Sequence, residues 1–117
     1  MLALCFITAT QAQSIVGKWE MSGQGPDGTP MTSSVTFKDD GKLEVDFGND
    51  GTVEVQSTYT MDGNKVSLKD LHPDSPCYNM VGIYEVTITD DEMTAKLVED
   101  PCETRRGDGS PMTMKRL

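Results

Sequence analysis

The sequence is poor in the residues that catalysis and nucleic-acid binding require. His72 is the only histidine among 117 residues, so neither a catalytic triad nor a zinc site has its usual partners. Lys and Arg number 10 against 19 Asp and Glu, giving a net charge of −9. Because phosphate binding needs clustered basic side chains, we expect neither nucleic acid nor an anionic membrane as a partner. We also expect no enzymatic activity, no cofactor and no metal.

Long hydrophobic runs are absent as well. No stretch is apolar over the ~20 residues that a membrane-spanning helix needs, so the protein is not expected to be transmembrane. Residues 1–12 are uncharged and mostly apolar, with the small residues Thr10 and Ala12 at the −3 and −1 positions of a signal-peptidase site. They are interpreted as a signal peptide, with the mature domain over 13–117. Since the basic n-region is missing, either the peptide is truncated or the start codon lies further upstream. A signal peptide indicates a secreted or periplasmic protein; a short buried first strand is the alternative.

Cysteine is also scarce. Of three cysteines, Cys5 lies in the expected signal peptide, which leaves Cys77 and Cys102. An even pair in an oxidising compartment predicts a disulfide, worth roughly 3–4 kcal/mol by the loop-entropy model. A redox or metal pair is the alternative, but neither cysteine stands in a C-x-x-C context. Leu4 disfavours lipidation of Cys5, because lipoprotein signals carry Gly or Ala at that position.

Alternation with a period of two recurs along the chain, whereas helical periodicity is absent. The segments between turn signals predict eight strands over about 15–21, 31–37, 43–47, 52–61, 66–68, 81–88, 93–98 and 112–116. An antiparallel meander with one apolar face buries that face by curling until its edge strands pair. We therefore predict a single all-β domain, an eight-stranded antiparallel up-and-down barrel. Such an interior is either filled by side chains or holds one small ligand.

A family resemblance rests on the two ends of this meander. Gly17-Lys18-Trp19 opens the first strand and Lys115-Arg116 closes the last. These motifs resemble the first and third signature regions of lipocalins and their small bacterial lipocalin-like relatives in the calycin superfamily. The run at 59–68 is also similar to the central hairpin of the bacterial relatives. The resemblance implies that Trp19 plugs the barrel floor, with Arg116, or else Lys115, packed on its face in a cation–π contact of about 0.5–2 kcal/mol.

The sequence departs from the family pattern in places. The middle signature, Thr-Asp before an aromatic, is present only as Thr89-Asp90 before a second Asp, and there is no C-terminal helix. Fatty-acid-binding proteins share the opening motif but need a helical lid after the first strand. The Gly- and Pro-rich segment 23–28 cannot form one.

The resemblance implies non-catalytic binding of a small apolar or amphipathic molecule inside the barrel. The candidate inward-facing residues are Phe37, Phe47, Val55, Tyr59, Tyr84 and Met93. The alternative is a protein-interaction module, in which the interior is packed and the loops contact another protein. An enzyme is disfavoured, because no nucleophile stands with a base.

Several short motifs have simpler interpretations. Gly23, Gly25 and Gly28 match G-x-G-x-x-G, but β-type sequence follows where the dinucleotide fingerprint needs a helix. The segment is better interpreted as a loop between the first two strands, which would act as a lid if the barrel binds a ligand. The acidic turns Asp39-Asp40 and 90–92 lack the spaced ligands of a calcium loop. Arg106-Gly107-Asp108 is too short a motif to indicate integrin binding; Arg105 and Arg106 are of interest instead as cations at one mouth of an acidic barrel.

Methionine is abundant by contrast. Seven Met follow the expected signal peptide, at positions 21, 31, 61, 80, 93, 112 and 114. Thioethers select soft metals such as Cu(I), but such sites need converging sulfurs, and only Met112 and Met114 are close in sequence. Met also fills irregular cores and pockets for varied apolar ligands. The sequence therefore favours core or pocket filling.

Overall fold

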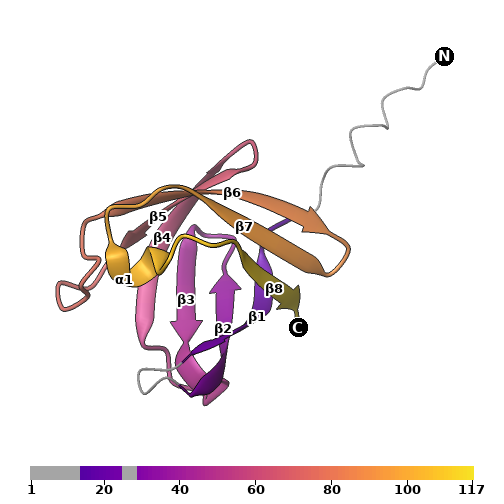
Figure 1. Ribbon diagram of the computed structural model, residues 1–117, viewed down its shortest axis with the longest axis horizontal. Coiled ribbons are helices and arrows are strands. Elements are labelled where there is room, and N and C mark those ends of the chain that lie inside the picture. Colours follow the sequence, from indigo (N-terminus) through magenta and orange to yellow (C-terminus); the bar gives the residue numbers. More distant parts are fainter. Residues whose placement is uncertain (1–13, 25–28) are drawn as a thin grey trace.

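The first and last strands of the chain lie side by side and close the sheet (Figure 1). The computed structural model describes residues 14–24 and 29–117. The strands are β1 (Gly17–Gln24), β2 (Pro30–Phe37), β3 (Lys42–Asp46), β4 (Val55–Asp62), β5 (Lys65–Asp70), β6 (Val81–Thr89), β7 (Glu92–Glu99) and β8 (Met112–Arg116). A 3-10 turn, η2 (Phe47–Asn49), follows β3, and a one-turn helix, α1 (Glu103–Arg106), precedes β8. The predicted all-β antiparallel barrel is confirmed.

Each strand pairs antiparallel with its neighbour in sequence, and β8 returns to β1 with Trp19 opposite Arg116. Closure removes the unpaired edges that a flat eight-stranded meander would expose. The hairpins are tight where the sequence carries turn residues. Gly63 has a φ of +65°, which lets two residues join Asp62 to Lys65.

The first strand runs over Gly17–Gln24 rather than 15–21, and the elements also differ from the prediction further along the chain. The third strand ends at Asp46, because the chain turns into η2 there and Phe47 leaves the sheet. The fourth begins at Val55, and Val53, expected within it, is exposed on the preceding connection. The short helix α1 lies in a segment expected to be a loop, since a single turn is too short to show helical periodicity.

The barrel has two different ends. We call the end where β1 begins and β8 finishes the floor end; the other, which carries the β1–β2, β3–β4, β5–β6 and β7–β8 connections, is the loop end. Buried apolar side chains fill the interior and include Trp19, Val35, Phe37, Leu43, Tyr59, Val66, Tyr84, Val86, Met93, Ala95 and Met114. No helix in the part of the chain that the structure describes is long and apolar enough to cross a membrane.

The expected signal peptide, 1–12, lies outside the described residues, as do residues 25–28 of the expected lid.

Candidate functional site

Trp19 forms the floor of the barrel and is fully buried. Its indole Nε1 donates a hydrogen bond of 2.9 Å to the carbonyl oxygen of Ile15, which also packs in the core. The guanidinium carbon of Arg116 lies 4.2 Å from the centroid of the Trp19 ring. The structure thus gives the covering role to Arg116, while Lys115 on the opposite strand face is exposed.

Arg116 also fixes the segment before β1. Its Nη1 and Nη2 donate to the carbonyl oxygens of Val16 and Ser14 at 3.0 and 2.8 Å. Gly17 is needed at this point, because it has a φ of +138° and a Cβ there would lie 2.7 Å from Nη1 of Arg116. Gly17, Trp19 and Arg116, which belong to the two signature motifs, therefore form one structural unit.

Phe37 and Tyr59 fill the barrel beside this floor. Their rings meet edge to face, with centroids 5.0 Å apart, a favoured aromatic geometry. The Tyr59 hydroxyl donates to the carbonyl oxygen of Lys38 at 2.5 Å. Burial, together with the charges of Asp39 and Asp40, raises the pKa of Tyr59. Both rings are buried against neighbouring side chains.

The other four candidates occupy three different environments. Met93 and Tyr84 are buried to 1% and 2% exposure and belong to the filled interior. Val55 is half-buried at the loop end, opposite Val45. Phe47 is 43% exposed in η2. Its expected inward position is wrong, because the turn breaks the alternation that would have carried the ring into the barrel.

Several interior apolar side chains near the loop end are only partly buried, as is Ile88 near the floor end. Four partly buried apolar residues at the loop end pack against the core, and Val55 pairs with one of them. All five lie within two residues of a strand end that joins the loop-end connections. We call them the apolar cup: Val45, Val55, Leu68, Leu97 and Met112. The sequence pattern identified Val55 alone, because alternation shows which face a residue occupies but not how deep it lies.

A polar cluster at the loop end is centred on Arg105 of α1. Its Nε and Nη2 donate to the two carboxylate oxygens of Asp100 at 2.7 and 2.9 Å. Its Nη1 reaches Asp70 at 3.2 Å, and Nη2 also donates to the carbonyl oxygen of Met80 at 2.9 Å. The Tyr84 hydroxyl donates to Asp100 at 2.5 Å. One cation therefore joins the ends of β5 and β7 to the β5–β6 connection.

The cluster is fully hydrogen-bonded. Asp70 accepts from the hydroxyls of Ser57 and Ser75 at 2.7 and 2.5 Å. Among the described residues, no buried side-chain nitrogen or oxygen lacks a partner. A network satisfied to this degree fixes structure. Sequence reasoning singled out Arg105 as a cation at the mouth but missed its partners, because Asp70 and Asp100 are brought to it only by barrel closure.

The cluster changes the acidity of its members. Burial raises the pKa of Asp100, but hydrogen bonds from Arg105 and Tyr84 outweigh this effect and leave the pKa below its ordinary value. Burial and the adjacent Asp100 carboxylate raise the pKa of Tyr84. Burial lowers the pKa of Arg105, yet its bonds to Asp100 raise it overall. The ion pair and the neutral phenol are thus the stable forms at neutral pH.

The predicted disulfide is present beside this cluster. Cys77 and Cys102 are bonded, with their Cα atoms 5.4 Å apart, and join the β5–β6 and β7–β8 connections. Gly82 leaves room for the cluster, because a Cβ there would lie 2.5 Å from Oδ2 of Asp100. Covalent and polar contacts therefore anchor the same two connections.

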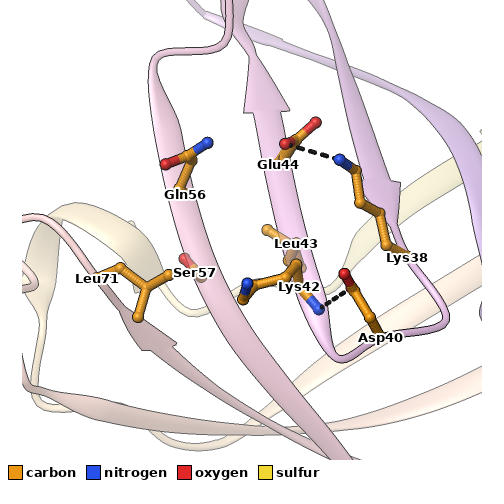
Figure 2. Close-up of a pocket in the computed structure, with 8 residues that line it drawn as sticks. All are labelled: Lys38, Asp40, Lys42, Leu43, Glu44, Gln56, Ser57 and Leu71. Carbon is orange, nitrogen blue, oxygen red and sulfur yellow. Dashed lines mark hydrogen bonds and ion pairs between the residues drawn. The ribbon is translucent and has the colours of Figure 1, made fainter.

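A hollow of about 150 Å³ lies over β3 and β4 (Figure 2). Its lining residues are Lys38, Asp40, Lys42, Leu43, Glu44, Gln56, Ser57 and Leu71. Two of these residues, Lys38 and Glu44, form an ion pair of 3.0 Å. Because the lining is mainly charged or polar, the hollow does not suit an apolar ligand.

Three carboxylates approach one another on the β3–β4 connection. Asp46, Asp50 and Glu54 each offer an oxygen within 4.8 Å of the others. Asp46 accepts backbone N–H bonds from Asp50 and Gly51, and Glu54 accepts one from Phe47. Burial raises the pKa of Asp46, but its backbone hydrogen bonds lower it overall. These contacts give the group a role in holding the turn.

Comparison with known proteins agrees with the geometry. No curated protein matches the sequence. The model of the lipocalin-like domain matches residues 15–95, more than half of the chain, from the segment before β1 to the middle of β7. The barrel adds β8 to this match, with Arg116 on Trp19. The chain therefore belongs to the lipocalin-like domain family.

Proposed function

We propose that the protein is an exported, non-catalytic binder of a small apolar or amphipathic molecule, held in the apolar cup. The observation that carries this is the set of partly accessible apolar side chains of the apolar cup near the loop end, whereas the interior around Trp19 is buried. Lipocalin-like barrels are ligand-binding folds, and eight strands leave room for one small molecule at most.

The chemistry of the cup supports this ligand class. Its five side chains are aliphatic or thioether groups, and the polar cluster around Arg105 lies at the same end. An amphipathic ligand can bury its apolar part against the cup and leave its polar part near the mouth. Met112 adds adaptability, because its unbranched side chain accepts varied shapes.

Two further features support the rest of the proposal. The Cys77–Cys102 bond is compatible with an extracellular or periplasmic location. Arg105, Asp100 and Tyr84 are committed to one another, and this favours a structural role for these groups over a catalytic one.

The test is displacement of a fluorescent fatty-acid analogue, compared between two adjacent substitutions. Leu97→Glu places a carboxylate in the cup, whereas Val98→Glu places it at a site that is 50% exposed. We expect micromolar binding to the unchanged protein, at least a tenfold loss for Leu97→Glu and little change for Val98→Glu. Leu97→Gln, with its fold checked by circular dichroism, provides a milder second variant.

Equal binding by all three variants would place the ligand outside the cup. Failure of every apolar probe to bind the unchanged protein would refute the proposed function. The interaction module would then be favoured, since the β5–β6 connection exposes Tyr78, Met80 and the first residue of β6, Val81. A photo-crosslinking residue at Tyr78, compared with one at Thr60 on β4, would identify such contacts.

A further inference from the structure

Methionines gather on one wall of the barrel interior. Of the seven in the described residues, Met61 and Met80 are exposed, and Met31 is half-buried near the start of β2. Met93 and Met114 are buried in the core, and Met21 and Met112 are partly buried against it. These four come from β7, β8 and β1, which are adjacent around the barrel. A set that is scattered in sequence is therefore concentrated in space.

The strand register places three of them in a single row. Met93 is the Cα partner of Met114 across β7 and β8, and Met114 is the partner of Met21 across β8 and β1. Side chains of directly opposed residues on one face have Cβ atoms about 4.5–5.5 Å apart. Met112 lies two residues before Met114, on the same face of β8. Met21 and Met93 flank Met114 on its two sides, so they are two strand spacings apart, and their flexible thioether side chains can turn toward the residue between them.

We propose that Met21, Met93 and Met114 bind a soft monovalent cation, Cu(I), inside the barrel. Thioether sulfur selects Cu(I) over harder divalent ions. Each sulfur donates a lone pair to the ion; no covalent bond of the protein breaks, no proton is released and no electron is transferred. Met112, on the same face of β8, is a fourth thioether next to the row. This site does not depend on the proposed apolar ligand.

Charge and access are compatible with a cation in this row. The nearest inward-facing cation on β8, Arg116, is held at the floor by Trp19, Ser14 and Val16. The protein as a whole carries a net charge of −9, which favours the approach of cations. Met21 is only partly buried, so one end of the row can be reached.

The experiment is a titration of the full chain with Ag(I), a redox-inert probe for Cu(I), followed by Cu(I) under anaerobic conditions. The chain carries Cys5→Ser, which removes the one thiol outside the disulfide. Methyl NMR of ¹³C-labelled Met gives one signal per residue. We expect the signals of Met21, Met93 and Met114 to shift at one equivalent, with those of Met61 and Met80 unchanged.

Matched substitutions separate this site from surface binding. Met21→Leu and Met114→Leu conserve volume, and each should weaken Ag(I) binding at least tenfold, while Met61→Leu and Met80→Leu should not. Because thioethers carry no titrating proton, affinity should be the same at pH 5.5 and 8, unlike that of a histidine site.

The proposal is overturned if the exposed methionines shift instead, if the interior Leu variants bind Ag(I) as before, or if affinity falls at pH 5.5. Thermal melting confirms that each variant is folded. Displacement of the fatty-acid analogue by the same variants reports on the cup separately, so either proposal can fail alone.

Discussion

Arg105 holds the carboxylate of Asp100 through two hydrogen bonds, from Nε at 2.7 Å and from Nη2 at 2.9 Å. The Asp100 side chain is fully buried, and the Arg105 side chain is 14% exposed. The same guanidinium reaches Asp70 on β5 and the carbonyl of Met80. A single side chain thus secures three segments at the loop end.

Arg105→Lys should therefore destabilise the protein by about 3 kcal/mol, because buried acceptors lose their donors. Lysine keeps the positive charge, but one ammonium cannot make the two-bonded contact with Asp100 and also reach Asp70 and the carbonyl of Met80. Urea unfolding with the disulfide intact measures the loss in the free energy of unfolding. Arg106→Lys is the control, because the structure gives Arg106 no ion pair among the described residues; its effect should stay below about 0.5 kcal/mol. Equal effects would contradict the role given to Arg105.

Acid should remove the stabilisation due to Asp100. Since its folded-state pKa is lowered from 3.8, the contribution is present above about pH 4 and is lost as the pH falls through the lower folded-state value. We expect the free energy of unfolding to fall less steeply below pH 4 in Asp100→Asn than in the unchanged protein. Asp62→Asn, at an exposed position, should follow the unchanged protein. If the free energy of unfolding falls equally steeply with pH in Asp100→Asn and in the unchanged protein, Asp100 is not the source of this stabilisation.

Gly82→Ala should cost about 1–3 kcal/mol. The added Cβ would lie 2.5 Å from Oδ2 and 2.7 Å from Cγ of Asp100, and that side chain is held too firmly to move away without strain. Gly23→Ala is a matched strand substitution with nothing within 4 Å of its Cβ. Thermal or urea unfolding should show a clear loss for Gly82→Ala alone. A stable Gly82→Ala variant would mean that the cluster can readjust.

Arg116→Ala should loosen the floor of the barrel. It removes a cation–π contact worth about 0.5–2 kcal/mol and two hydrogen bonds to the segment before β1. The only tryptophan reports the change directly: its emission should shift to the red and acrylamide should quench it more. Lys115→Ala, on the exposed face, should leave both unchanged. The opposite pattern would reassign the cover to Lys115.

Local pattern predicted much of the fold but only part of the site. Alternation such as Tyr84, Val86 and Ile88 identified strands and their inner faces, and the Trp19 and Arg116 motifs indicated where the barrel closes. The same pattern placed Phe47 inside, because it does not show where a strand gives way to a turn. The methionine row was missed, since Met21, Met93 and Met114 become neighbours only through closure.

The sequence by itself determined the number of strands, their order and the choice of Cys77 and Cys102 as a pair, because these depend on short-range periodicity and on counting. Tertiary structure decided which charges meet, which thioethers align and which end of the barrel stays accessible. Those properties depend on the register between strands and on the pairing of the first with the last. Such contacts join residues up to 102 positions apart, and no local pattern specifies them.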